Sequence, residues 1–349
     1  MAIGIGIGLP FRRNIATTPA VPSGLSASFT VDTISGDLTW TDNSGGTAQY
    51  EVYSSYNGNP YVYLGTTLAG ATSYSDTTCK QNASVVYRIR AKKGGTYSEY
   101  VTTSVINTPL CWKTNQATRT NVLINNITIT AGKTVNIDWG DGTNANYTGA
   151  NTNVTHTYAA SATNIFNVKL SGDIGSITTF QHYSQSKSYG VVTNWVLPST
   201  LTIFSIYSTG LTGVVTNWVL PSTLKSFYIF STGLTGSLPQ ITEHATNAMN
   251  YRANSAYMSD SNVTVFRKAM TNFDVSSQNV TFSTANIDKL LKAAADWYQV
   301  NAPTANCTFN LSGTNMGIPT GGASNVDIVR LIGYYSAAGF AATIICRTS

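Results

Sequence analysis

The sequence predicts a mostly β, multidomain chain in which two β-sandwiches precede a solenoid with helices in its C-terminal repeats. The chain has 349 residues, and at about 150 residues per domain this length suits two or three domains. Short alternating runs separated by turn clusters fill the first half, as in β-sandwiches. In the second half, residues 190–201 recur identically at residues 213–224, 23 residues later, and such a period is typical of repeat architectures.

The composition argues against nucleic-acid-binding and membrane-spanning proteins. Charged residues make up 10% of the chain, against roughly 25% in an ordinary soluble protein. The net charge of +5 is spread thinly, and without a Lys/Arg cluster we expect no nucleic-acid partner. No apolar run approaches the roughly 18 residues of a membrane span. A charge-poor, Thr- and Asn-rich chain is typical of extracellular or virion proteins.

Metal and cofactor chemistry is not expected. The cysteines are too far apart for a C-x-x-C motif, and we interpret them as buried free thiols. The histidines lie outside any H-x-x-x-H setting, so a zinc site would lack ligands. These residues are Cys79, Cys111, Cys307 and Cys346, and His156, His182 and His244.

Residues 1–19 form a predicted anchor peptide and linker. Isoleucines alternate with glycines, so an extended chain carries an apolar face and a bare face. We expect this strand to pair with another subunit by β-augmentation; a floppy tail is the alternative. The charges at Arg12 and Arg13 follow the apolar stretch, and without a convincing cleavage site we expect no signal peptide. The predicted anchoring residues are Ile3, Gly4, Ile5, Gly6, Ile7, Gly8, Arg12 and Arg13.

Residues 20–107 are predicted to form the first sandwich. Residues 38–40, 50–53 and 87–91 each place alternate side chains inward, with Trp40 filling the core. Together with the Pro22-x-x-Leu25 entry, these strands resemble a fibronectin type III domain. Such domains are spacers or binding modules, so the resemblance implies no chemistry.

Residues 108–172 are predicted to form a second sandwich. Residues 135–142 read VNIDWGDG, and a later T-H-T-Y run ends at Tyr158; together they resemble a PKD-type immunoglobulin-like domain. Asp138, Asp141 and His156 invite a metal or acid/base interpretation. We expect them to be structural, because the Asp-Gly pair makes the turn and no further ligands cluster nearby.

Residues 173–349 are predicted to form the solenoid. The two repeats share the pattern L-x-x-F-x-I-x-x-T-x-L-x-G, which resembles a leucine-rich repeat with Thr209 and Thr232 at the usual Asn position. A threonine hydroxyl is still able to bond a neighbouring backbone group. A third unit over residues 249–254 is expected to restore the asparagine at Asn254.

The last repeats are predicted to contain helices and a closing strand. Helical spacing of apolar residues predicts helices over 287–300 and 326–338, and residues 343–346 read as the strand. The inward positions expected are Ile287, Leu290, Leu291 and Ala294 in the first helix, and Val326, Val329, Ile332 and Tyr335 in the second.

The C-terminal segment from residue 310 closely resembles a repeat module of leucine-rich proteins from bacteriophages that infect Bacteroidetes-type hosts. With the I-G-I-G start, this resemblance implies a fibre or decoration protein in the virion of a tailed phage similar to the crAss-like group. The implied partners are other virion proteins at the N-terminus, a host-surface glycan or protein, and a second copy of the chain. A bacterial surface adhesin is the alternative, and an accessory module of a carbohydrate-active enzyme would need a catalytic domain that we do not find.

Attachment rather than catalysis is expected. No acidic residue occurs between Asp173 and Glu243, so the first repeats cannot supply paired carboxylates. The predicted ligand-binding residues are Tyr207, Tyr228 and Phe230, which a solenoid places on one open face about 5 Å apart. Packing against a neighbouring domain or subunit is the alternative. Replacing them is expected to leave stability nearly unchanged, whereas Trp195 and Trp218 are expected to pack internally.

Overall fold

The computed structural model describes residues 17–115, 122–159, 165–240, 249–254, 256–261, 266 and 269–347. The chain divides into two compact units, Met1–Cys79 with Ser84–Asn107, and Lys80–Ala83 with Thr108–Ser349. The predicted anchor residues, from Ile3 to Arg13, lie outside the described residues. Neither of the two α-helices described below has the length and hydropathy of a membrane-crossing helix.

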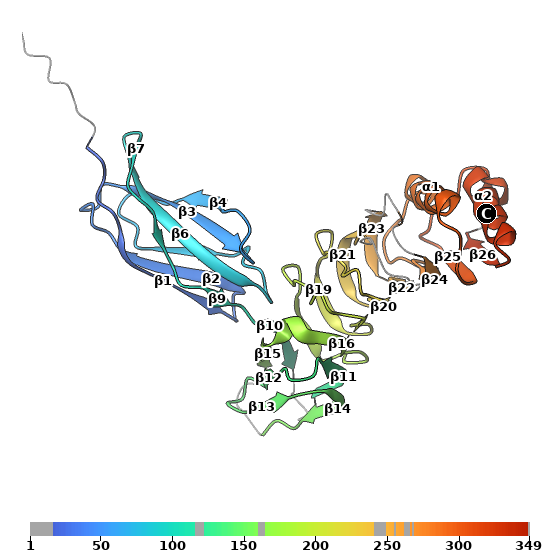
Figure 1. Cartoon of the computed structure of the whole chain (residues 1–349), viewed down its shortest axis with the longest axis horizontal. Coiled ribbons are helices and arrows are strands. Elements are labelled where there is room, and N and C mark those ends of the chain that lie inside the picture. Colours follow the sequence, from blue (N-terminus) through green and yellow to red (C-terminus); the bar gives the residue numbers. More distant parts are fainter. Residues whose placement is uncertain are drawn as a thin grey trace, which may run out of the picture. The chain divides into compact units, whose positions relative to one another are not determined.

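The first unit is a β-sandwich of two antiparallel sheets (Figure 1). One sheet has the order β1 (Ser23–Thr30), β2 (Ser35–Thr41) and β5 (Ser73–Asp76). The other has the order β4 (Val62–Thr66), β3 (Gln49–Tyr56), β6 (Ser84–Lys93) and β7 (Thr96–Tyr97), with β8 (Val101–Thr102) and β9 (Ile106–Asn107) also paired to β6.

The core of this sandwich confirms the strands expected from the sequence. Leu38 and Trp40 on β2 pack against the inward residues of β3 and β6, because alternate residues of a strand face the same side. The Trp40 and Tyr50 rings are 5.2 Å apart. The strand order and this core are those of a fibronectin type III-like domain, as predicted.

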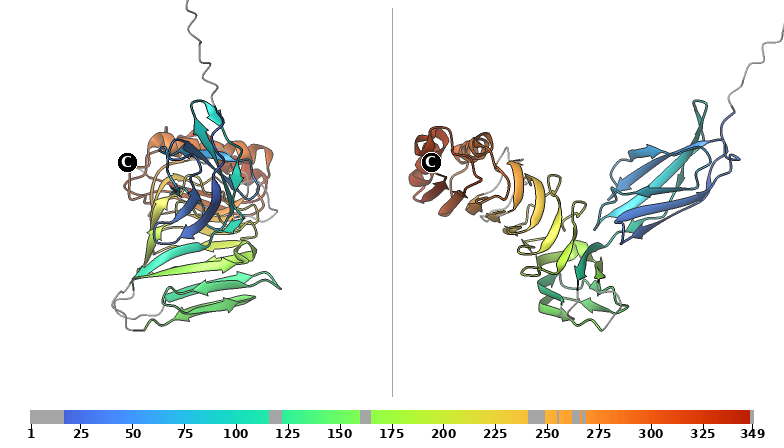
Figure 2. Two further views of the ribbon diagram at one scale, coloured as in Figure 1. Left: turned by 90° about the vertical axis from the view of Figure 1, so that its left-hand side faces the viewer. Right: turned by 180° about the vertical axis from the view of Figure 1, so that it is seen from behind.

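The second unit is built on two long sheets, of which one ends at β23 and the other continues to the last strand, β26 (Figures 1 and 2). The eight-stranded sheet has the order β13 (Asn144–Tyr147), β12 (Val135–Asp138), β15 (Ile165–Gly172), β10 (Leu110–Asn115), β17 (Ser188–Val191), β19 (Gly210–Val214), β21 (Gly233–Leu238) and β23 (Tyr257–Ser261). The nine-stranded sheet has the order β14 (Ala150–His156), β11 (Val122–Ile129), β16 (Ile177–Gln181), β18 (Ile203–Ser205), β20 (Ser226–Tyr228), β22 (Met249–Arg252), β24 (Met270–Asp274), β25 (Cys307–Leu311) and β26 (Ala342–Cys346).

Antiparallel pairing in the segment expected to form a second sandwich gives way to parallel pairing in the solenoid. β11 pairs with β16 and β10 pairs with β17, so each sandwich sheet continues into a solenoid sheet. A short 3-10 helix, η1 (Ile174–Ser176), lies between the two regions. One hydrophobic core extends from Leu110 to Tyr335, so the expected boundary at residue 172 does not separate two compact units.

The repeat period sets the register of the coils. Phe204 pairs with Phe227, and Phe227 pairs with Tyr251, so equivalent residues stack in columns. Each coil turns with tight backbone geometry: Gly213 has φ +128°, and a Cβ there would lie 2.8 Å from the Thr193 hydroxyl. A side chain at this position would therefore be strained and crowded.

Of two predictions about the threonine and asparagine positions of the repeats, one is confirmed and one is wrong. Thr209 and Thr232 are buried and donate to the carbonyls of Ile206 and Ile229 at 2.9 and 2.8 Å, so the expected local bond is present. Asn254 does not take the equivalent position in the third unit. The pairing of Tyr251 with Phe227 places Asn254 in the column of Phe230 instead, and that part of the repeat prediction was wrong.

The two predicted helices are present as α1 (Thr284–Val300) and α2 (Val326–Ala337), with a short 3-10 helix, η2 (Gly322–Ser324), before the second. Each begins at a side-chain cap, Ser283 for α1 and Asn325 for α2, which satisfies backbone donors of the first turn. The buried residues of α1 include all four expected ones.

The inward face predicted for α2 was largely wrong. Its buried residues are Ile328, Leu331 and Tyr335, whereas three of the expected inward residues are exposed, namely Val326 (68%), Val329 (59%) and Ile332 (48%). Both sets have helical spacing, so periodicity alone did not select between them.

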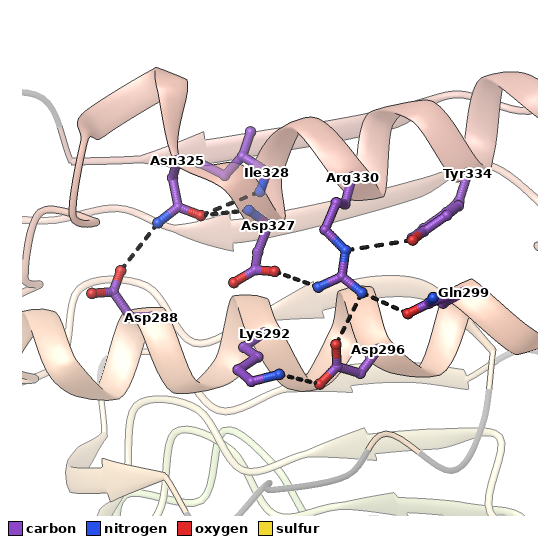
Figure 3. A network of polar contacts seen from close by, with 9 residues as sticks. All are labelled: Asp288, Lys292, Asp296, Gln299, Asn325, Asp327, Ile328, Arg330 and Tyr334. Atoms are coloured by element: carbon purple, nitrogen blue, oxygen red, sulfur yellow. Dashed lines mark hydrogen bonds and ion pairs between the residues drawn. The ribbon is translucent and has the colours of Figure 1, made fainter.

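Polar contacts between the two helices fix which face of α2 is turned away from the core (Figure 3). Arg330 donates to Asp327 on its own helix and to Asp296 and Gln299 on α1, at 2.7 to 3.0 Å. Arg330 thus holds α2 against α1, while the side of α2 that carries Ile328 packs into the core.

Candidate functional site

The candidate site is a column of aromatic side chains on the nine-stranded sheet. In each early coil an inward aromatic residue is followed three positions later by a second aromatic residue that emerges beyond the strand end. In-register pairing places these residues side by side, and neighbouring strands are about 4.8 Å apart. We call this column the aromatic ladder; its members are Tyr183, Tyr207 and Phe230.

The rings of the aromatic ladder stack face to face. Tyr183 and Tyr207 have ring centroids 4.7 Å apart with planes at 5°, and Tyr207 and Phe230 are 4.1 Å apart at 13°. Tyr228 meets Phe230 edge-on at 6.4 Å. All four side chains are half-buried, so the three predicted residues lie together at the surface.

Tyr183 was missed from the sequence, although a signal for it exists. The spacing from Phe180 to Tyr183 equals that from Phe204 to Tyr207 and from Phe227 to Phe230. The segment around Tyr183 lies before the identical repeats, so the equivalence becomes evident only from the pairing of Phe180 with Phe204.

Arg252 extends the aromatic ladder into a polar region. Its guanidinium carbon lies 4.6 Å from the Phe230 ring centroid, within cation–π range. Its Nε lies 3.7 Å from Asp274 Oδ2, and this buried nitrogen has no hydrogen-bond acceptor within the described part of the chain. Asp274 also accepts hydrogen bonds from the backbone and hydroxyl of Ser276, at 3.1 and 2.6 Å.

Two asparagines continue the polar region along the same face. The Asn272 amide donates to Asn250 at 3.1 Å across neighbouring strands β24 and β22. An open hollow of about 430 Å³ begins at Ser231, directly after Phe230, and is also lined by Thr232, Tyr257 and Asn279. The face therefore combines ring edges, amides and one cation with an adjoining polar hollow.

The tyrosine hydroxyls in and beside the aromatic ladder keep hydrogen-bonding capacity that the described residues do not use. Among the residues that the structure describes, no hydrogen bond involves the hydroxyls of Tyr183, Tyr207 or Tyr228. Burial raises the pKa of Tyr207, and a protonated phenol is able both to donate and to accept hydrogen bonds.

Asp138, Asp141 and His156 hold a turn together. Asp138 binds Lys169 at 2.6 Å, and Asp141 accepts from the Thr143 backbone at 3.0 Å. Asp141 Oδ2 lies 2.7 Å from His156 Nε2. Burial would raise the pKa of Asp141, but the hydrogen bonds from Thr143 and His156 outweigh it and the pKa is lowered.

The ring of His156 is also held in place by packing. It stacks on Trp139 with centroids 4.9 Å apart. Among the described residues no group of three His, Cys, Asp or Glu side chains is arranged to hold a metal ion. The Asp138, Asp141 and His156 atoms named above all bond to other side chains or backbone groups of the same turn and its neighbouring strands. This agrees with the expectation that the three residues stabilise the fold.

The remaining residues singled out in the sequence are internal. Trp195 and Trp218 are each 3% exposed and stack at 6.5 Å. Their indole nitrogens donate to the carbonyls of Cys111 and Val192, so the prediction of internal packing is confirmed. All four cysteines are free; three are buried, and Cys346 is half-buried.

Comparisons with known proteins identify no family for the chain. No family model matches it, and no curated protein matches it. Among solved structures, a Fn3-like protein from Clostridium thermocellum is similar at 27% identity, over 27% of this chain and 97% of that one, with a TM-score of 0.23.

Two bacterial pectate lyases are also similar. PelI from Erwinia chrysanthemi aligns at 10% identity over 75% of this chain and 84% of its own, with a TM-score of 0.21. Pel3 from Pectobacterium carotovorum aligns at 11% identity over 74% of this chain and 80% of its own, with a TM-score of 0.20. The strand pairing of the chain itself defines its architecture: a fibronectin type III-like β-sandwich followed by a β-solenoid.

Proposed function

We propose that the chain is a non-enzymatic attachment protein whose solenoid binds a host-surface glycan along the aromatic ladder. The observation that carries this proposal is the row formed by Tyr183, Tyr207 and Phe230 with Arg252 at its end. Tyrosine hydroxyls and a guanidinium are hydrogen-bonding groups suited to sugar hydroxyls, and their apolar ring edges suit the sugar's C–H groups.

The geometry changes how the glycan would be held. The rings cover one another's faces at 4.1 and 4.7 Å, which leaves no room for a sugar between them. A ligand therefore meets ring edges and hydroxyls, and hydrogen bonds supply most of the recognition. Such contacts repeat from coil to coil at about 4.8 Å, which favours an extended polymer over a compact molecule.

The charges near the ladder favour attachment over hydrolysis. Residues 174–242 contain no acidic residue, and the carboxylate of Asp274 is engaged by Ser276 and Arg252. Glycoside hydrolysis normally uses two carboxyl groups separated by roughly 5 to 10 Å. Among its described residues, the face thus offers binding groups without the acid and base pair of that reaction.

The proposal includes the setting predicted from the sequence. In that setting the chain is a fibre or decoration protein of a phage virion, held by residues 3–13 and displaying its two compact units. The resemblance of its C-terminal segment to phage leucine-rich proteins supports this setting.

The test is binding of the full chain to an array of neutral and acidic bacterial oligosaccharides. Tyr207→Phe and Tyr228→Phe each remove one hydroxyl and keep the ring, and we expect affinity to fall by roughly 2- to 10-fold per lost hydrogen bond. Tyr189→Phe on the opposite sheet is the matched control. Absence of binding to the whole array, or equal binding by all three variants, would refute the proposed function.

A further inference from the structure

A second group of aromatic and charged residues lies on the outer face of the fibronectin type III-like unit. On β6, the buried residues Val85, Tyr87, Ile89 and Ala91 alternate with half-buried outward residues. The outward positions carry Arg88, Arg90 and Lys92. Apart from Lys80, every base between residues 17 and 107 lies on β6, so the positive charge of the described part of this unit is concentrated on one strand.

Tyrosine rings alternate with these cations. Arg88 lies between Tyr61 and Tyr100, with its guanidinium carbon 4.0 Å from each ring centroid. Arg90 lies 3.9 Å from the Tyr97 ring and 4.9 Å from the Tyr100 ring. We call these five residues the cation ladder. Because rings cover both faces of the Arg88 guanidinium, its orientation is fixed.

The carboxylate of Glu51 pairs with Arg90 of the cation ladder but not with Arg88. Glu51 is 6% exposed and accepts from Arg90 at 2.8 and 3.0 Å and from Lys92 at 3.1 Å. Arg88 forms no ion pair with any described residue, and its buried Nε has no acceptor there. The neighbouring Glu99 is exposed and forms no ion pair with a described base. Arg88 therefore keeps unfilled hydrogen-bond donors on a strand where Glu51 pairs with the other two outward cations.

We propose that the cation ladder binds a carboxylate-bearing polysaccharide, with one carboxylate on Arg88 and sugar rings against the exposed tyrosines beside it. Tyr63 and Tyr97 are 52% and 39% exposed, which leaves ring surface for C–H contacts. A guanidinium matches a carboxylate through two parallel hydrogen bonds. A nucleic acid would need a row of unpaired cations to follow its phosphates, whereas two of the three cations here are ion-paired with Glu51.

This site belongs to the other compact unit and does not depend on the aromatic ladder. The probe is a mixture of alginate oligosaccharides, which carry one carboxylate per sugar, compared with the same oligosaccharides after chemical reduction of the carboxyl groups. The full chain is expected to bind the acidic form at least about tenfold more tightly, the factor that one charge-assisted hydrogen bond supplies.

Arg88→Gln is expected to remove this preference, and Arg88→Lys to retain part of it, because lysine keeps the charge without the planar fork. Lys93→Gln is the matched control, since Lys93 lies on the same strand and its contact is with the Thr47 hydroxyl at 3.0 Å. Circular dichroism and thermal unfolding show whether each variant remains folded, and alginate affinities are compared only between folded variants.

Three results would overturn the proposal. The first is equal binding of the acidic and reduced oligosaccharides, including no binding of either. The second is alginate binding as tight as that of the wild type in both folded variants, Arg88→Gln and Arg88→Lys. The third is tighter binding of single-stranded DNA than of alginate. Unchanged oligosaccharide binding by Tyr207→Phe and Tyr228→Phe, together with an alginate preference that Arg88→Gln removes, would count against the solenoid proposal alone.

Discussion

The face-to-face stack of Tyr207 between Tyr183 and Phe230 implies that the aromatic ladder stabilises the solenoid. Replacing Tyr207 with alanine removes two ring pairs, at 4.7 and 4.1 Å. Each aromatic pair contributes about 0.5–1.5 kcal/mol beyond burial, so Tyr207→Ala should cost about 1–3 kcal/mol from stacking. Tyr228→Ala removes one edge contact at 6.4 Å and should cost no more than about 1.5 kcal/mol. This reverses the expectation from the sequence that such replacements leave stability nearly unchanged.

Hydrogen exchange of the full-length protein measures this effect locally, because the amides of β18 and β20 report the opening of the coils that carry the ladder. A double-mutant cycle with Tyr207→Ala and Phe230→Ala isolates the pair, with an expected coupling of about 0.5–1.5 kcal/mol. A coupling below about 0.3 kcal/mol, together with equal costs for Tyr207→Ala and Tyr228→Ala, would show that the rings do not stack.

Three further outcomes are expected. Deleting residues 2–13 should leave the unfolding of both compact units unchanged while abolishing incorporation into particles; normal occupancy of the truncated chain would rule out the anchor. A metal chelator should not alter thermal unfolding, because Asp138 and Asp141 are engaged by Lys169, Thr143 and His156; a fall of several degrees would contradict this. Burial would raise the pKa of Glu51, but hydrogen bonds from the two cations beside it outweigh burial and lower the pKa. The stability that this group contributes is therefore present above its ordinary pKa of 4.5 and is lost as pH falls through the lowered value. The free energy of unfolding of Glu51→Gln should therefore depend less on pH than that of the wild type between pH 6 and pH 3. An unchanged pH dependence would exclude the ion pairs.

The sequence predicted features that depend on local spacing. Alternation located the inward residues of β2, β3 and β6, and the 23-residue period located the coils and the columns containing Tyr207 and Phe230. Spacing alone did not determine which face of a short helix is buried. In α2 the Ile328 face packs into the hydrophobic core, and Arg330 bonds to Asp296 and Gln299 of α1, which lie more than 30 positions away.

The cation ladder shows a second limit of sequence reasoning. Arg88 and Arg90 are visible as alternate polar residues of one strand, which indicates only an outward face. Their ring partners lie on three other segments, at Tyr61, Tyr97 and Tyr100. Because these rings come from the residue before β4 and from the region around β7, predicting the cluster requires the strand order, which is a non-local property of the fold.

The two ends of the parallel part of the nine-stranded sheet, β16 and β26, differ in a way that predicts how the solenoid opens. At one end, β16 is covered by the antiparallel strand β11, so the first coil is stabilised by the sandwich strands. At the other end, β26 pairs only with β25 among the described strands, Ile345 is 42% exposed, and a cavity of about 620 Å³ lies between this strand and α2. Because each coil is stabilised mainly by its neighbours, local opening should start at β26 and proceed toward β18. Amides of β26 should therefore exchange before those of β20, and the reverse order would mean that another surface covers this end in solution.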